Sequence, residues 1–165
     1  MLHAMEKCSI IIPHYGAYGI IKKDSQILLV TKSRGPYQGL LDLPGGTIAG
    51  FESSKTALRR EIKEETKLTV RKSTMVGFYE CTIPLDAHTD MNHRGIIYVI
   101  EHFSGTLDSL SQEDVSASGW YSFHDCQQTK LTPFAWQAVT HFLKADFHND
   151  VQSRFSKSNA FSSAK

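Results

Sequence analysis

The segment "GGTIAGFESSKTALRREIKEETKL", residues 45–68, decides the fold because it joins a pair of glycines to a strong helix signal. Ser53 can accept a hydrogen bond from the first free backbone amides of a helix. Three apolar residues then follow at helical spacing, namely Ala57, Leu58 and Ile62. The segment therefore predicts a glycine loop and then a helix from Ser53 to about Thr66.

Three carboxylates, those of Glu61, Glu64 and Glu65, crowd one side of this predicted helix. They fall within a band roughly 100° wide. Like charges four residues apart destabilise a helix by about 0.2–0.5 kcal/mol, so the band needs solvent screening or a bound cation. Arg60 stands four residues before Glu64 and favours an ordinary solvated face. The neighbouring glycines favour a Mg²⁺ site, because they let backbone oxygen approach an ion closely.

The composition is that of one ordinary globular domain: 165 residues, 41% of them hydrophobic, with a net charge of +1. This charge gives no reason to expect nucleic acid or a membrane as a partner. Cys8, Cys81 and Cys126 are widely spaced and include no CxxC pair, which predicts free thiols in a reducing compartment. The apolar residues 9–12 end at Pro13, too early for a signal peptide. We expect a cytoplasmic protein.

The rest of the chain predicts strands and a second helix. Strands are expected at residues 15–31 as a hairpin, and at 40–43, 68–83, 95–103 and 119–123. Thr132 can cap a helix that has Pro133 in its first position. Its expected apolar face consists of Trp136, Val139, Phe142 and Leu143. Strands interleaved with two helices predict an α/β sheet covered by helices on its faces.

The C-terminal end differs in composition from the rest. We interpret residues 1–145 as a single domain and residues 146–165 as a serine-rich tail. Phe147, Val151 and Phe155 recur every fourth residue of this tail. Such spacing indicates a stripe that could dock as a helix.

The opening segment resembles the Nudix box, the pattern of the MutT-like Nudix hydrolases. The matching residues are Gly46, Glu52, Arg60, Glu61, Ile62, Glu64, Glu65 and Leu68. Every charged position of the pattern is present at the right spacing. The order of predicted elements from about Tyr15 to Ala145 is also similar to the Nudix fold. The resemblance implies an α/β/α sandwich with a mixed β-sheet.

This resemblance implies hydrolysis of a nucleoside diphosphate linked to another group, as in an NTP, a nucleotide sugar or ADP-ribose, with Mg²⁺ or Mn²⁺ required. The implied metal ligands are Gly46, through its carbonyl, and the catalytic carboxylates of Glu61, Glu64 and Glu65. One of these carboxylates could also deprotonate the water. Glu52 and Arg60 match positions that form a structural ion pair in the family. Members of the family are often dimers, so this chain could also form a homodimer.

The chain departs from the family pattern at Lys67, where the box helix usually ends in glycine. A left-handed residue closes the last turn there, so a lysine should cost up to about 1 kcal/mol or end the helix differently. Metal binding should survive, because no ligand changes.

Weaker signals lie outside the box. Lys32 and Arg34 could meet substrate phosphates or remain solvated loop charges. Arg34 is the better candidate, because a guanidinium can grip two phosphate oxygens. Tyr37 could stack on a base, although packing on the domain is the simpler interpretation.

Two acidic or histidine-containing segments leave several roles open. Asp86, His88, Asp90 and His93 lie in the predicted loop 84–94. Their spacing fits no standard zinc pattern, so a substrate contact, a lid or a plain polar connection are the alternatives. Glu113 and Asp114 precede Trp120, in a region where Nudix enzymes sometimes place a further acid for base catalysis.

Two other functions compete with hydrolysis. A diphosphate isomerase on this fold would need a cysteine in the pocket, for which only Cys81 is a candidate. A catalytically silent, nucleotide-sensing Nudix domain would normally have lost some box acids, and here all of them are present.

Overall fold

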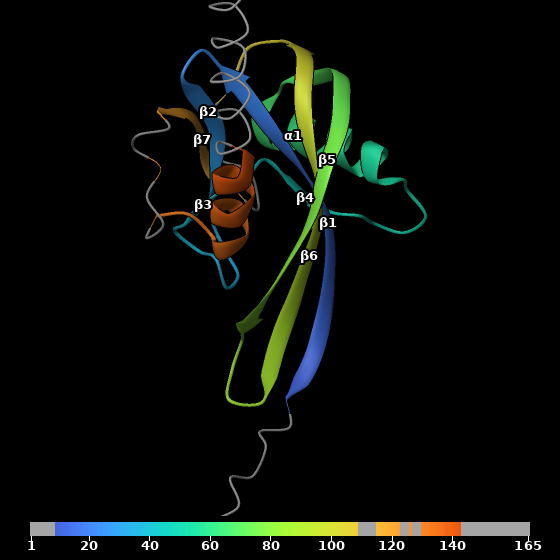
Figure 1. Cartoon of the computed structure of the whole chain (residues 1–165), viewed down its shortest axis with the longest axis vertical. Coiled ribbons are helices and arrows are strands. Elements are labelled where there is room, and N and C mark those ends of the chain that lie inside the picture. The colour runs from blue at the N-terminus through green and yellow to red at the C-terminus, as the bar shows by residue number, and fades with distance from the viewer. Residues whose placement is uncertain (1–8, 109–114, 123–125, 127–129, 143–165) are drawn as a thin grey trace, which may run out of the picture.

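The computed structural model describes residues 9–108, 115–122, 126 and 130–142. Its strands are β1 (Ile10–Lys23), β2 (Gln26–Lys32), β3 (Leu41–Asp42), β4 (Gly45–Thr47), β5 (Thr69–Pro84), β6 (Thr89–Ser104) and β7 (Val115–Ser122). The helix α1 spans Ser54–Thr66, and residues 133–142 form another helix (Figure 1). The predicted order of strands and helices is confirmed in these ranges, except that the expected glycine loop contains the short strand β4.

The strands form a mixed sheet in the order β3-β2-β1-β6-β5, with β4 paired to β1 and β7 paired to β2. The pair β1–β6 is parallel, and the other strand pairs are antiparallel. β4 pairs with the segment Gly16–Tyr18 in the middle of β1. The glycine pair of the opening segment is thereby held against a central strand.

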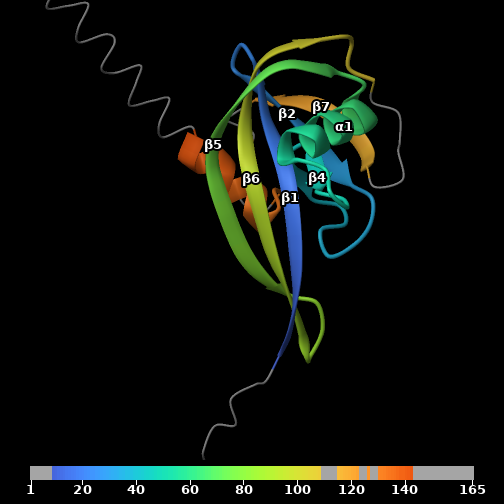
Figure 2. The ribbon, with the colours of Figure 1, turned by 90° about the vertical axis from the view of Figure 1, so that its right-hand side faces the viewer.

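Helices cover both faces of the sheet. One apolar cluster packs under α1 and includes Ala17, Ile21, Leu28, Leu58 and Ile62. A second cluster packs under the helix of residues 133–142 and includes Tyr18, Ile20, Leu29, Phe134 and Val139. Because successive strand residues point to opposite faces, β1 contributes to both clusters. Figure 2 shows the two helices on opposite sides of the sheet, which confirms the predicted α/β/α sandwich.

Both ends of α1 are fixed by local contacts. The Ser53 hydroxyl accepts a hydrogen bond from the amide of Thr56 at 3.2 Å, so the predicted N-cap is confirmed. Lys67 follows the helix with φ 62° and ψ 1°, and its amide donates to the carbonyl of Lys63 at 3.1 Å. The lysine therefore adopts the left-handed conformation for which the family pattern uses glycine.

The expected polar loop of residues 84–94 is mostly strand, so that prediction is wrong. β5 continues to Pro84, and β6 begins at Thr89 instead of Gly95. The pairing between the two strands runs without a break from Tyr79 to Pro84. β1 also begins five residues early and pairs with β6 along this length. Pairing between strands overrides the polar composition here, and the three strands project beyond the body of the domain (Figures 1 and 2).

The second helix forms where predicted, and its predicted apolar face is confirmed at Val139, which is 1% exposed. The hydroxyl of Thr132 accepts a hydrogen bond from the amide of Ala135 at 3.0 Å. The fully buried aromatic residue is Phe134, whereas Trp136 and Phe142 are only partly buried. The buried face is therefore rotated around the helix from the predicted one and includes Phe134, Ala135 and Ala138 beside Val139. Leu143 and the tail residues Phe147, Val151 and Phe155 lie outside the described residues, as does Cys8.

Candidate active site

A cleft of about 270 Å³ lies where β1, β4 and α1 meet the chain after β2. It is lined by His14, Tyr18, Lys32, Arg34, Pro36, Tyr37, Asp42, Gly45, Gly46, Thr47, Glu61, Glu65, Met91 and His93. Acidic and basic side chains therefore share this cleft with four aromatic or imidazole rings. The size suits part of a small ligand better than a macromolecule.

The glycine pair lets the backbone of β4 pack closely on its neighbours. At Gly45, φ is +141° and a Cβ atom would lie 2.3 Å from the carbonyl oxygen of Ala17. A Cβ atom on Gly46 would lie 2.7 Å from Cδ of Glu61. The Glu61 carboxylate thus packs directly against the backbone of Gly46, in space that any other residue would fill.

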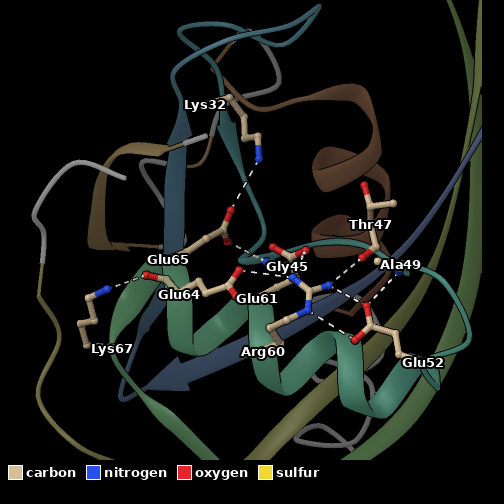
Figure 3. A network of polar contacts seen from close by, with 10 residues as sticks. All are labelled: Lys32, Gly45, Thr47, Ala49, Glu52, Arg60, Glu61, Glu64, Glu65 and Lys67. Atoms are coloured by element: carbon tan, nitrogen blue, oxygen red, sulfur yellow. Dashed lines mark hydrogen bonds and ion pairs between the residues drawn. The ribbon is translucent and has the colours of Figure 1, made fainter. Parts of the chain in front are cut away.

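Arg60 connects the acids of the helix to the loop before it (Figure 3). Its Nη2 lies 2.6 Å from Oε1 of Glu52, and its Nε lies 3.3 Å from Oε2 of the same residue. Its Nη1 donates to Glu61 at 2.8 Å and to Glu64 at 3.3 Å. Nη2 also donates to the carbonyl of Thr47 at 3.1 Å. The hydrogen bond from Arg60 lowers the pKa of Glu52.

The three helix carboxylates have different surroundings. Glu65 is 5% exposed, accepts a hydrogen bond from the amide of Gly45 at 2.8 Å, and lies 3.5 Å from Nζ of Lys32. Burial raises the pKa of Glu65 to about 8, although Lys32 opposes this shift. Burial also raises the pKa of Glu61, whereas Glu64 is largely exposed. Two of the three carboxylates are therefore desolvated beside the cleft.

In this arrangement, the described part of the chain contains no group of three or more acidic, histidine or cysteine side chains close enough to hold a metal ion. Arg60 and Lys32 instead hold the carboxylates as ion pairs. The donor set nevertheless fits a hard divalent cation. Glu61 and Glu65 border one cleft, burial disfavours their charged forms, and Gly46 leaves the backbone beside Glu61 open.

Both basic residues singled out from the sequence, Lys32 and Arg34, line this cleft. The sequence favoured Arg34, but only Lys32 is within ion-pair distance of a helix carboxylate, that of Glu65. Tyr37 also lines the cleft and is 8% exposed. The structure therefore brings the predicted phosphate-binding residues to the same cleft as the acids.

The chain matches the model of a known protein family. The model of the NUDIX domain matches residues 12–142. The chain belongs to the Nudix family. The predicted recognition of a Nudix box is thereby confirmed, and a Nudix-type enzyme is the class that the family supports.

Individual relatives agree with this assignment. An ADP-ribose pyrophosphatase from Methanocaldococcus jannaschii is 33% identical over 99 residues, which cover 58% of this chain and 54% of that protein. The chain thus spans about half the length of that relative. A MutT Nudix hydrolase from Burkholderia pseudomallei has a similar structure, with a TM-score of 0.69 and 27% identity, covering 78% of this chain and 97% of the other. A MutT protein from Bacillus halodurans, at 21% identity and a TM-score of 0.65, shares the fold, over 79% of this chain and 82% of that chain.

Three ionisable cleft residues of the Nudix chain were not singled out from the sequence: His14, Tyr18 and Asp42. Asp42 is 2% exposed, and its Oδ1 accepts hydrogen bonds from the amide of Leu43 and the hydroxyl of Thr132. Burial raises the pKa of Asp42 to about 6. One signal was present, because an aspartate inside the apolar run "LLDL" is unusual for a buried strand.

The four acidic and histidine residues of segment 84–94 do not come together as a metal site within the described chain. The amide of His88 donates to Asp86 at the turn, whereas His93 lies in β6 and lines the cleft. A substrate contact was one of the alternatives for this segment, and it stays a prediction. Glu113 and Asp114 lie outside the described residues. Within the described ranges, no helix is long and apolar enough to cross a membrane.

Proposed function

We propose that this protein is a Nudix-type pyrophosphohydrolase that cleaves the pyrophosphate bond of a nucleoside diphosphate linked to another moiety, with Mg²⁺ or Mn²⁺ as cofactor. One observation supports this most strongly. Two acids of the Nudix box, Glu61 and Glu65, border the same cleft as Lys32 and Arg34. A substrate diphosphate and its counter-cation can both be accommodated there.

The metal ligands in this proposal are the carbonyl of Gly46 and the carboxylates of Glu61, Glu64 and Glu65. When bound, a divalent cation would neutralise the charge of the diphosphate and lower the pKa of a bound water. Water oxygen then forms a bond to phosphorus, the bond to the bridging oxygen breaks, and the leaving phosphate keeps the electron pair. One helix carboxylate accepts the proton of the water.

Arg60 and Glu52 position the acids. Because Arg60 contacts Glu52 twice and the carbonyl of Thr47 once, it stays anchored when its contacts to Glu61 and Glu64 are given up. The guanidinium can therefore release those two carboxylates without leaving the loop. This makes Arg60 and Glu52 a structural ion pair beside the metal ligands.

Lys32 and Arg34 are proposed to bind phosphate oxygens, because both are cationic side chains that line the cleft. ADP-ribose is the first substrate to test, since the relative from M. jannaschii is named an ADP-ribose pyrophosphatase. Nucleoside triphosphates and nucleotide sugars present the same diphosphate. A cytoplasmic location and a homodimer remain predictions of this proposal.

The test is hydrolysis by the purified full chain of ADP-ribose, nucleoside triphosphates, nucleotide sugars and dinucleoside polyphosphates, with Mg²⁺, Mn²⁺ or a chelator. We expect turnover that the chelator abolishes. Glu64→Gln should lower kcat by about 10³-fold with the fold retained. Glu101→Gln is the matched control, because it removes the same charge from an exposed residue of β6 outside the cleft.

Absence of turnover with every substrate and both metals would overturn the proposal. Nucleotide binding by calorimetry without turnover would instead indicate the silent sensing domain. The isomerase alternative loses support, because Cys81 is not among the residues that line the cleft, and burial raises the pKa of its thiol.

A further inference from the structure

A chain of side-chain hydrogen bonds runs along the cleft wall away from the Nudix box. The hydroxyl oxygen of Tyr18 lies 2.8 Å from Nε2 of His93 and 3.2 Å from Nε2 of His14. The hydroxyl oxygen of Tyr37 lies 3.0 Å from Nδ1 of His93 and 3.7 Å from Sγ of Cys81. His93 stands at the centre, because a tyrosine hydroxyl contacts each of its ring nitrogens.

The ring of His93 is held firmly in this position. It is 1% exposed and stacks on Phe134 with ring centres 4.3 Å apart and an interplanar angle of 13°. Burial lowers the pKa of His93 to about 3, and burial also lowers the pKa of His14. Both imidazoles are therefore neutral at pH 7, and each has one N–H donor and one acceptor nitrogen.

Counting hydrogens leaves two arrangements that satisfy every contact. If Nε2–H of His93 donates to Tyr18, the Tyr18 hydroxyl donates to Nε2 of His14, and His14 has its hydrogen on Nδ1. If Tyr18 instead donates to Nε2 of His93, then Nε2–H of His14 donates to Tyr18, and Nδ1 of His14 is a bare acceptor. If both Nε2 atoms carry a hydrogen, the hydrogen of the Tyr18 hydroxyl has no acceptor; if neither does, one of the two contacts has no hydrogen, although Tyr18 is only 3% exposed. Hydrogen bonds in both contacts therefore require opposite tautomers in the two histidines.

We propose that His14 contacts the heterocyclic base of the substrate through Nδ1, and that the buried His93 is a positioning residue that sets, through Tyr18, whether this atom donates or accepts. This deepens the proposed function and rests on it, because it takes a nucleotide as the ligand. His14 lines the cleft, and among the described residues none hydrogen-bonds its Nδ1.

The chemistry of this wall favours an uncharged, planar, polar group. Its side chains are neutral at pH 7, since burial lowers the pKa of both histidines and raises those of Tyr18 and Tyr37. A nucleobase offers ring area and hydrogen-bonding groups without charge. Because the chain can reverse its polarity as a unit, His14 can meet an amino group with an acceptor or a keto group with a donor.

The first test measures the tautomers directly, in the full chain labelled with ¹⁵N at histidine, without substrate. Two-bond ¹H–¹⁵N spectra at pH 7 distinguish Nδ1–H from Nε2–H, and the variants His14→Gln and His93→Gln each identify the signals of the histidine they remove. We expect neutral rings with opposite tautomers in His14 and His93. Tyr37→Phe should fix His93 as Nε2–H, because a buried bare nitrogen is tolerated better than a buried N–H without a partner. His14 should then become Nδ1–H.

The second test measures specificity. Calorimetry with Mg²⁺ gives dissociation constants for the α,β-methylene diphosphates of adenosine and inosine, which differ in an amino and a keto group. Tyr37→Phe should change the ratio of the two constants by about fivefold, the effect of one neutral hydrogen bond. Tyr79→Phe is the control, because Tyr79 lies on β5 and takes no part in this chain of bonds; it should leave the ratio unchanged.

The same tautomer in both histidines, a charged ring, a ratio that stays within twofold, or no binding of either analogue would overturn the inference. The tautomer measurement needs no turnover, so it stands apart from the test of hydrolysis. Hydrolysis of nucleotides with an unchanged ratio would leave the proposed function in place and reject this role of His14.

Discussion

Lys67→Gly should stabilise the protein, because Lys67 ends α1 with φ 62°. A side chain in the left-handed region costs about 1–2 kcal/mol. The substitution also removes the hydrogen bond from Nζ of Lys67 to the carbonyl of Glu64, 3.1 Å long, which contributes about 0.5 kcal/mol at an exposed position. The net gain in the free energy of unfolding is about 0.5–1.5 kcal/mol, which raises Tm by roughly 1–6 °C in a chain of this size.

Thermal and urea unfolding of the wild type, Lys67→Gly and Lys67→Ala measure this gain. Alanine loses the same hydrogen bond but keeps the backbone strain, so Lys67→Ala should be no more stable than the wild type. A glycine variant no more stable than the alanine variant would refute the reasoning. Hydrolysis should change by less than about twofold in both, since Lys67 does not line the cleft.

Three further predictions follow from the site. Gly46→Ala should lower kcat/KM by about 10²-fold, because the new Cβ displaces the carboxylate of Glu61, whereas Gly119→Ala, a looser position, should not. Burial raises the pKa of Asp42 from 3.8 to about 6, so this residue should contribute a loss of up to about 3 kcal/mol of stability as pH rises from about 4 to about 6. Asp42→Asn should remove this contribution to the slope in urea unfolding and leave that of Glu65, whose pKa is also raised. Glu52→Gln removes the charge of a main partner of Arg60. Arg60 should then pair more strongly with Glu61 and Glu64 and compete with the metal, so the Mg²⁺ concentration that gives half-maximal activity should rise.

The box helix could be predicted from sequence because its signals are local. Ser53 caps the helix, and Ala57, Leu58 and Ile62 are buried as their spacing indicated. The length of β6 could not be predicted in the same way. Its first residues, from Thr89 to Arg94, are mostly polar, and they become strand because they pair with β1 and β5. Such pairing depends on partners distant in the chain.

Only part of the cleft could be predicted from the sequence, because the rest depends on contacts between distant segments. The acids and Gly46 lie in one motif, whereas His14, Tyr18 and His93 come from two strands that meet only in the folded sheet. Their ring contacts depend on Phe134, which belongs to a helix still further along the chain. No spacing rule brings these residues together before the topology is known.

Cationic partners explain how α1 can crowd its carboxylates. Arg60 holds Glu61 and Glu64, and Lys32 holds Glu65, so the acids are paired by this chain's own side chains. The solvated-face and metal-site interpretations are therefore compatible: in the proposed function, the same carboxylates exchange these cationic side chains for a divalent ion. A divalent ion must displace existing ion pairs instead of filling an uncompensated site. The loss of these ion pairs makes the net free energy of metal binding less favourable. Because the carboxylates are already paired, folding does not require the metal ion.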